Sequence, residues 1–202
     1  MTLVDSIGIK RLGSAAYLPT LAAMKDFTAR RNGETADELW LLEHPPVYTL
    51  GQGADHAPVE NGIPLVRADR GGDITYHGPG QLVVYTLVDL ARRGIKVRQF
   101  VALLEQAVID LLGGRGERRV GAPGVYVDGA KIAALGIRVR QGRAYHGLAL
   151  NVDMDLSPFR AIDPCGYPGL AVTQTKDIGM TETITALGER LAALLVEKIE
   201  HA

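Results

Sequence analysis

The only cysteine of the chain, Cys165, stands between a proline and a glycine in the stretch "IDPCGYPGL". A free cysteine is most often a small buried hydrophobic residue. The stiff, loop-forming composition around Cys165 favours a reactive thiol instead, because loops carry a disproportionate share of catalytic residues. A cysteine attacks as its thiolate, and a nearby cation favours that form. The candidate cations are Lys131, His77 and His146, and sequence spacing does not decide between them.

The stretch "RGGDITYHGPGQ", residues 70–81, is a second candidate for chemistry. Its glycines let the backbone approach a ligand closely. Arg70 offers a planar fork of donors, and His77 can donate or accept a proton near neutral pH. A glycine-rich hairpin turn with a solvated arginine explains the composition equally well. The stretch matches neither the Walker phosphate loop nor G-x-G-x-x-G, so no nucleotide site is predicted.

Residues 128–153, "DGAKIAALGIRVRQGRAYHGLALNVD", contain the third candidate, Lys131. Strand alternation predicts one face made of Lys131, Ala133, Leu135 and Ile137. Such a lysine is partly buried or points into a cleft. The commoner alternative is a lysine at a strand end whose ammonium group reaches water. His146 is ambiguous as well, because a histidine in a strand is more often structural than catalytic.

Composition sets the class of protein. The chain has 202 residues, of which 47% are hydrophobic and 22% charged, which is ordinary for one globular domain spanning residues 1–202. A formal net charge of −1 gives no reason to expect nucleic acid or a membrane as a partner. One cysteine excludes an internal disulfide and a zinc site built from thiolates, so no metal is expected. With no signal-peptide pattern and no apolar run of membrane-spanning length, we expect a cytoplasmic protein.

Hydrophobic periodicity predicts the elements that position these residues. Apolar residues every three to four positions predict helices within residues 15–34, 97–114 and 184–200. Strands are predicted at residues 37–44, 47–51 and 81–90, and hairpin turns at Asp128-Gly129 and Gln141-Gly142. A short helix is predicted from Ser157-Pro158. The order helix, mixed strands, helix, hairpins, helix indicates a mixed α+β or α/β fold.

Five ordered stretches together resemble one family, the lipoyl(octanoyl) transferases, which are the octanoyl-[acyl-carrier-protein]:protein N-octanoyltransferases of lipoate biosynthesis. The stretches are "RRNGETADELWLLEHPPVYTLGQ", "RGGDITYHGPGQLVVY", "GVYVDGAKIAALGIRV", "YHGLALNV" and "IDPCGYPGLAVTQ". The resemblance implies a fold like that of the biotin and lipoate protein ligases, a mixed sheet flanked by helices, with the catalytic region over residues 30–202.

The resemblance also implies an activity. Octanoyl-acyl carrier protein would donate the octanoyl group to a specific lysine of lipoyl-domain proteins, the E2 subunits of 2-oxoacid dehydrogenases and the glycine-cleavage H protein. Transfer from a thioester to an amine runs downhill, so neither ATP nor a cofactor is expected. The family's acyl-accepting cysteine matches Cys165, and its lysine matches Lys131. The chain is expected to act as a monomer.

The stretches that contact substrate in this family match fifteen positions here: Arg70, Gly71, Gly72, Asp73, Ile74, Thr75, Tyr76, His77, Ala134, Leu135, Gly136, His146, Gly147, Leu148 and Ala149. Many relatives have serine at the position of Ala134, so a backbone role is expected there. The eight-carbon chain also needs apolar walls, for which we name Leu82, Val84, Ala133, Leu135, Leu148 and Leu150. A basic run, Arg92, Arg93, Lys96 and Arg98, is a candidate docking site for an acidic partner.

Lys131 is expected to act twice: its ammonium stabilises the Cys165 thiolate, and its amine takes the proton of the acceptor lysine. Three alternatives remain open at this point. One is an ATP-dependent ligase of the same fold, which needs no cysteine nucleophile. Another is a Cys–His pair that uses His77 or His146 as the base. The third is a binding module for acyl carrier or lipoyl domains with an inert thiol.

Overall fold

The computed structural model describes residues 6–54, 61–162 and 169–202. Cys165 therefore lies outside the described residues. Nine strands and four α-helices follow one another along the chain as β1 (Ile7–Ser14), α1 (Tyr17–Arg30), β2 (Asp37–Glu43), β3 (Val47–Leu50), β4 (Leu65–Arg67), β5 (Ile74–His77), β6 (Gln81–Asp89), α2 (Leu90–Arg93), α3 (Val97–Leu111), β7 (Gly124–Val127), β8 (Ala130–Arg140), β9 (Arg143–Asn151) and α4 (Ile184–Glu200) within these ranges. Among the residues described between β9 and α4, Ser157–Ala161 and Lys176–Ile178 form the 3₁₀ helices η1 and η3.

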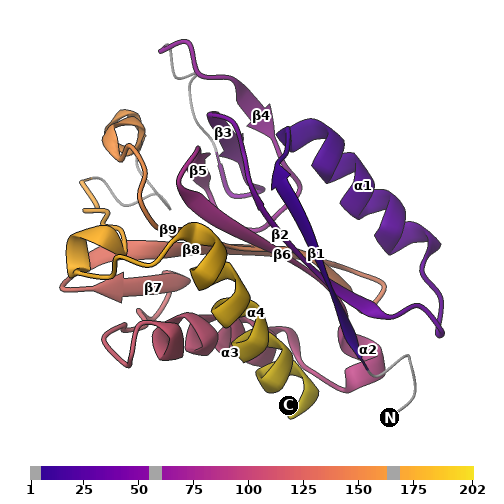
Figure 1. Cartoon of the computed structure of the whole chain (residues 1–202). Coiled ribbons are helices and arrows are strands. Elements are labelled where there is room, and N and C mark those ends of the chain that lie inside the picture. Colours follow the sequence, from indigo (N-terminus) through magenta and orange to yellow (C-terminus); the bar gives the residue numbers. More distant parts are fainter. Residues whose placement is uncertain (1–5, 55–60, 163–168) are drawn as a thin grey trace.

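Two sheets organise the fold. The large sheet has the strand order β1-β2-β6-β9-β8-β7, in which only the β1–β2 pair is parallel. The small sheet has the order β4-β3-β5. Helices α3 and α4 lie side by side on one face of the large sheet, and α1 lies on the other face (Figure 1). The predicted class, a mixed sheet flanked by helices, is confirmed.

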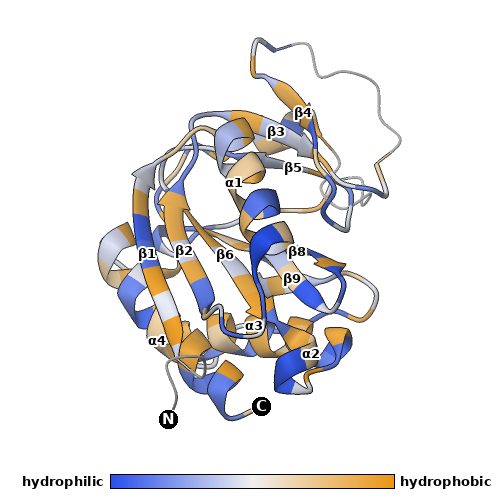
Figure 2. Cartoon of the chain, turned by 90° about the vertical axis from the view of Figure 1, so that its right-hand side faces the viewer, coloured by the Kyte–Doolittle hydropathy of each residue, from blue (hydrophilic) through white to orange (hydrophobic). Residues whose placement is uncertain are grey.

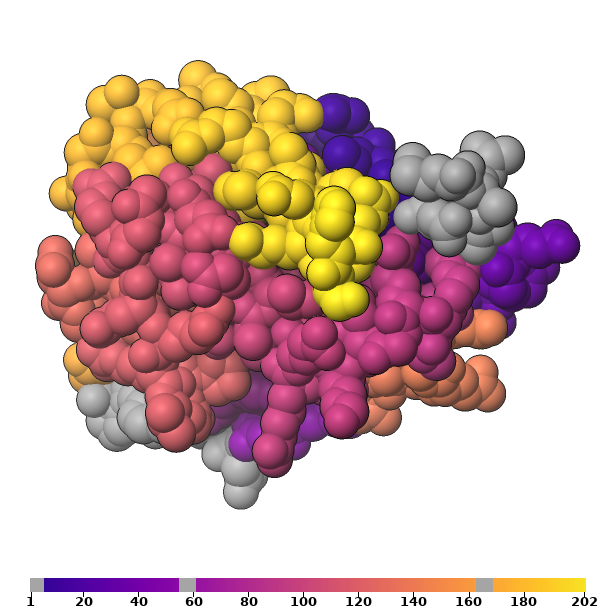
Figure 3. Space-filling view, turned by 90° about the horizontal axis from the view of Figure 1, so that it is seen from below, coloured from indigo at the N-terminus to yellow at the C-terminus, as the bar shows by residue number. Residues whose placement is uncertain are grey.

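Apolar side chains fill both faces of the large sheet. The core under α3 and α4 contains Phe100, Leu104 and Leu191, all fully buried. Seen from below, the two helices make up much of the molecular surface (Figure 3). The core under α1 contains Met24 of the helix itself, Trp40 of β2 and further residues of β2, β6 and β9. Because both faces of the large sheet are covered, its central strand β6 is buried along its whole length.

The predicted helices and both hairpin turns are confirmed, but one strand was missed. Residues 7–14 form β1, which pairs with β2 at the edge of the sheet, so a strand precedes α1 in the described part of the chain. Hydrophilic and hydrophobic residues mix along β1 (Figure 2). Most of β1 is exposed, which removes the hydrophobic pattern that marks a strand in a sequence.

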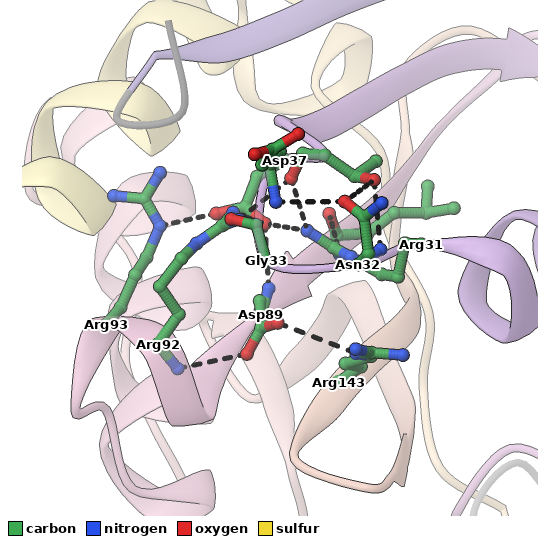
Figure 4. A network of polar contacts seen from close by, with 11 residues as sticks. Arg31, Asn32, Gly33, Asp37, Asp89, Arg92, Arg93 and Arg143 are labelled. Carbon is green, nitrogen blue, oxygen red and sulfur yellow. Dashed lines mark hydrogen bonds and ion pairs between the residues drawn. The ribbon is translucent and has the colours of Figure 1, made fainter. Parts of the chain in front are cut away.

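A buried carboxylate, Asp37, joins three elements at one end of the large sheet (Figure 4). Asp37 begins β2 and is fully buried. It accepts ion-paired hydrogen bonds from Arg31, from Arg92 at 2.8 Å and from Arg93 at 2.5 Å. The backbone N–H of Asp89 donates a further bond of 2.8 Å. Burial alone would raise the pKa of Asp37, but these hydrogen bonds outweigh it and hold the pKa below the ordinary value.

The same contacts correct one expectation. Arg92 and Arg93 are largely buried in ion pairs with Asp37, at side-chain exposures of 22% and 12%. They are therefore not part of an open basic surface. Lys96 and Arg98 are exposed, but they do not make the four-residue docking patch that the sequence suggested.

Replacing Asp37 tests how much this network stabilises the fold. Asp37→Asn leaves buried guanidinium groups without their anion, so the free energy of unfolding should fall by roughly 3–5 kcal/mol. The difference from the parent should shrink as the pH falls below 3.8, because the depressed pKa makes this contribution full only above that value. Urea unfolding at several pH values measures both effects.

The exposed pair Arg30–Asp26 on α1 provides the matched control. Asp26→Asn removes the same charge type from a solvated pair and should change stability by no more than about 0.5 kcal/mol. If both variants lost the same free energy of unfolding, the buried Asp37 network would stabilise the fold no more than an exposed ion pair does.

Candidate active site

A pocket lies between the two sheets. The large sheet contributes residues of β6, β8 and β9, the small sheet contributes β5, and α1 contributes Tyr17. The lining residues are Tyr17, Arg70, Gly72, Asp73, Ile74, Thr75, His77, Val83, Tyr85, Ala134, Leu135, Gly136, His146, Gly147, Leu148 and Ala149. Residues far apart in the sequence thus share one wall.

Two glycines let the parts of this wall approach each other. Gly136 and Gly147 pair across β8 and β9. A Cβ on Gly147 would lie 2.1 Å from the carbonyl oxygen of Val84, so no other residue fits against β6 there. A Cβ on Gly136 would lie 2.9 Å from the carbonyl oxygen of Gly71. These positions therefore need glycine for close backbone approach.

The loop of residues 70–73 is fixed to both sheets. Arg70 is buried, and its guanidinium donates to the carbonyl oxygen of Thr49 at 2.6 Å and to its hydroxyl at 2.8 Å. The backbone N–H of Gly71 donates to the carbonyl oxygen of Ile137 on β8 at 3.0 Å. The loop thus bridges β3 and β8, which places Gly72 and Asp73 in the cavity wall.

His77 is held as a neutral ring. Its Nδ1 donates to Oε1 of Gln81 at 2.7 Å, while the Gln81 amide nitrogen donates to Tyr76 and to Asn151. The bond to Gln81 leaves Nε2 as the unprotonated nitrogen. Burial, with a smaller contribution from His44, lowers the pKa of His77 to about 3. His77 therefore carries no charge at neutral pH.

His146 is the second histidine in the wall. Its Nε2 donates to Asp69 at 2.8 Å, and its backbone has a φ of +62°, in the left-handed region. Burial lowers the pKa of His146, and the bond to Asp69 opposes that effect only in part. Neither predicted histidine therefore supplies a permanent cation to the site.

Lys131 is buried, with 3% of the residue exposed, but it does not lie on the face that alternation predicted. Val125 pairs with Ala133 and Tyr126 pairs with Lys131, so Ile132 is an extra residue that forms a β-bulge. Ile132 and Ala133 both enter the core under α3. The bulge thus separates Lys131 from the core-facing set of Ala133, Leu135 and Ile137.

The side chain of Lys131 lies instead over Gly124 and the ring of Tyr126. Its Nζ is 5.4 Å from that ring's centroid and 3.1 Å from the place where a Cβ on Gly124 would stand. Gly124 pairs with Ala134, which lines the cavity. The backbone of Lys131 also bonds to Ala171 and Thr173, at 2.8 and 3.0 Å. The segment that follows the cysteine stretch in the sequence is thus attached to this strand.

The structure brings most of the predicted substrate contacts to the cavity. Two lie elsewhere: Gly71 lines an adjoining cleft, and Tyr76 packs against Phe159 in a separate apolar cluster. Among the predicted acyl walls, Leu135 and Leu148 line the cavity. Leu148 also belongs to the core under α3 and α4, and Leu135 packs against that core; the other four predicted walls, Leu82, Val84, Ala133 and Leu150, belong to the core without lining the cavity.

Sequence reasoning missed three lining residues, Tyr17, Val83 and Tyr85. The last two lie on the opposite face of β6 from Leu82 and Val84, and a strand buried on both faces gives no signal for which face meets a cavity. Tyr17 precedes the predicted catalytic region of residues 30–202, and its helical spacing is that of an ordinary core residue.

The sequence matches the family described as the lipoyl protein ligase A/B catalytic domain over residues 16–195. The chain belongs to this family. It is 61% identical to an octanoyltransferase of Aromatoleum aromaticum over 93% of this chain and 83% of that protein. It is 62% identical to an octanoyltransferase of Thiobacillus denitrificans over 98% of this chain and 91% of that protein.

Solved structures of other members and neighbours share the fold. A bipartite lipoate protein ligase from Thermoplasma acidophilum aligns with a TM-score of 0.71 at 18% identity, over 96% of this chain and 84% of that one. A biotin protein ligase from Aquifex aeolicus aligns with a TM-score of 0.54 at 12% identity, over 98% and 71% of the two chains. The predicted relation to biotin and lipoate ligase folds is thus confirmed.

The described ranges contain no group of three or more His, Cys, Asp or Glu residues placed to hold a metal ion. No helix in the same ranges has the length and hydrophobicity needed to cross a membrane.

The charge state of His77 is directly measurable. Its ring should stay neutral, with the proton on Nδ1, from pH 7.5 down to pH 5, because its pKa is lowered from 6.5 to about 3. Long-range ¹H–¹⁵N correlation spectra of the folded protein report this tautomer. In urea the same histidine should titrate near the ordinary value.

This shift also makes stability depend on pH. The unfolded chain binds a proton at His77 below pH 6.5 and the folded chain does not, so His77 should destabilise the fold by up to about 1.4 kcal/mol per pH unit there. A titration midpoint near 6.5 in the folded protein would show that the Gln81 bond does not hold the neutral ring.

Proposed function

We propose that this member of the family transfers an octanoyl group from octanoyl-acyl carrier protein to a lysine of a lipoyl domain, with Cys165 as the nucleophile and Lys131 as the proton acceptor. The observation that carries the proposal is the placement of Lys131. It is buried over Gly124, which pairs with the cavity-lining Ala134, and its backbone pairs with the segment that follows the Cys165 stretch. The relatives named octanoyltransferase support the acyl group.

The reaction divides into two balanced steps. The Cys165 thiolate attacks the thioester carbonyl of the donor, the donor C–S bond breaks, and the carrier leaves as a thiolate that takes a proton from the Lys131 ammonium, so Lys131 becomes the amine. The acceptor amine then attacks the octanoyl-cysteine, an amide bond forms, and Cys165 leaves as a thiolate. The proton that the amine loses goes to Lys131. A thioester supplies enough free energy for an amide, so the chemistry needs no ATP.

The electrostatics of the cavity favour Lys131 over the histidines. Burial lowers the pKa of both His77 and His146, so neither is positively charged beside a thiolate at neutral pH. His77 also directs its one N–H at Gln81 rather than at a substrate. Lys131 is the buried lysine next to the cavity wall, which makes it the better partner for an anionic sulfur.

The cavity supports an acyl substrate. Its floor is made of short side chains, Ala134, Ala149 and Val83, together with Gly136 and Gly147. Such a surface excludes bulky groups but accepts a flexible alkyl chain. The partners are acyl carrier protein and lipoyl domains of E2 subunits and of the H protein, which would be met in the cytoplasm. Monomeric action belongs to the same proposal.

Intact-mass spectrometry tests the acyl-enzyme. The parent, incubated with octanoyl-acyl carrier protein and no acceptor, should gain one hydroxylamine-labile octanoyl group, and Cys165→Ala should gain none. A lipoyl domain added afterwards should remove the adduct and become octanoylated. Transfer that requires ATP, or binding of the donor with no transfer at all, would support the ligase or the binding module instead.

Substitution of Lys131 separates its two roles. Lys131→Arg keeps a positive charge but cannot release a proton near neutral pH. The octanoyl-enzyme should still form, while its transfer to the lipoyl domain should slow by about 10²–10⁴-fold, the usual contribution of a positioned base.

Quenched-flow mass spectrometry of each half-reaction measures these rates. Lys131→Met removes the charge as well, so both half-reactions should slow. If Lys131→Arg transfers the octanoyl group as fast as the parent, another group accepts the proton.

A further inference from the structure

The floor of the cavity is a row of small residues that crosses the large sheet in register. Gly124 on β7 pairs with Ala134 on β8, Ala134 pairs with Ala149 on β9, and Ala149 pairs with Val83 on β6. The row begins beneath Lys131, whose Nζ lies 3.1 Å from the Cβ position of Gly124. Neighbouring strands are ~4.8 Å apart, so the whole row spans about 14 Å and its cavity-lining part, from Ala134 on β8 to Val83 on β6, spans about 10 Å. This is the length scale of an extended octanoyl chain.

The row ends where Tyr17 from α1 meets the sheet. The next pair beyond Val83 is Leu42 on β2, and Val83, Leu42 and Tyr17 belong to one buried cluster. Tyr17 lines the cavity and is only 6% exposed. A straight chain that starts near Lys131 and follows the small residues therefore reaches the phenol ring of Tyr17 at its far end.

The ring of Tyr17 packs against two neutral histidines, His44 and His77, which also contact each other at 5.7 Å. It stacks on His77 with centroids 6.1 Å apart and an interplanar angle of 13°, and it meets the edge of His44 at 5.2 Å. His44 in turn bonds to the carbonyl oxygen of Ala15 at 2.6 Å and to the hydroxyl of Tyr85 at 2.7 Å. The ring is thus packed from behind and cannot swing away without disturbing these contacts.

The hydroxyl of Tyr17 plays no part in holding the ring. It is buried and has no hydrogen-bond partner among the described residues. A buried hydroxyl without a partner is unfavourable, and an apolar chain pressed against it would not relieve that state. Ring packing alone therefore fixes the position of Tyr17 at the end of the row.

We propose that Tyr17 is a specificity-determining residue whose ring closes the acyl channel and limits the length of the acyl chain. The proposal rests on the proposed function, because it takes the thioester end of the substrate to lie near Lys131. One methylene more or less in an apolar pocket changes selectivity by about 10–200-fold. A rigid wall at the end of the row therefore discriminates strongly against chains longer than octanoyl.

The test is the ratio of kcat/KM for decanoyl- and octanoyl-acyl carrier protein in variants of Tyr17. Tyr17→Leu shortens the wall, so this ratio should rise at least tenfold over that of the parent. Tyr17→Phe keeps the ring, so its ratio should stay within a factor of about three of the parent's. An unchanged ratio in Tyr17→Leu would overturn the proposal, and so would a tenfold rise in Tyr17→Phe, which would assign the limit to the hydroxyl.

Leu21→Ala is the matched control. Leu21 lies one turn further along α1 in the same buried cluster but not in the cavity wall. It should lower the stability while leaving the ratio at the parent's value. A shifted ratio in Leu21→Ala would show that loosening α1, rather than the wall, sets the preference.

A binding measurement keeps the test independent of turnover. Calorimetric titration of octanoyl- and decanoyl-pantetheine into each variant should show the same reversal of preference in Tyr17→Leu as the kinetics. If the parent transfers no octanoyl group but binds these thioesters with the expected length preference, the proposed transferase function is wrong, while the proposed acyl channel is supported. If the parent transfers octanoyl groups and Tyr17→Leu keeps the parent's preference, the function stands and the end wall fails.

Discussion

The buried carboxylate of Asp37 is the interaction on which the placement of the cavity depends. It bonds to Arg31, directly after α1, and to arginines of α2, while itself beginning β2. At the other end of α1, the N–H of Ala15 bonds to the carbonyl of Glu43, where β2 ends. Helix α1 is thus attached to β2 at both ends. Its first-turn residue Tyr17 therefore occupies one position over the sheet, and the depth of the cavity follows from that position.

The polar side chains in and around the cavity mainly hold neighbouring parts of the fold together. His77, His44 and Arg70 form hydrogen bonds with neighbouring parts of the fold, and burial lowers the pKa of both histidines. An uncharged histidine ring costs little to cover with an alkyl chain, whereas a charged ring would have to lose its water first. The bulge at Ile132 turns Lys131 away from the core-facing residues of β8 and places it over Gly124, at the start of the apolar floor.

Sequence patterns predict the helices and strands whose hydrophobic residues are regularly spaced. They fail where that spacing is interrupted. Leu21, Met24 and Phe27 follow a helical spacing, so α1 was predictable. Ile132 adds one residue to a strand, and no local signal in "AKIAALGI" shows it, so alternation placed Lys131 on the wrong face. The glycine-rich motif marked the loop at Arg70, since close backbone approach demands glycine. No comparable sequence signal marked Val83 or Tyr17. A buried strand, or the buried face of a helix, has the same hydrophobic pattern whether it faces a cavity or solid core.

The edge strand β1 has a consequence for the behaviour of the protein at high concentration. An exposed sheet edge is a template on which other chains can add strands and aggregate. Here the outermost strand carries Lys10 and Arg11, whose side chains are half exposed, and its pairing with β2 shifts at Gly13, which has a φ of +62°. Charge and irregular backbone both oppose the addition of a further strand. The residues that made β1 hard to recognise in the sequence thus protect the large sheet from growing into a fibre.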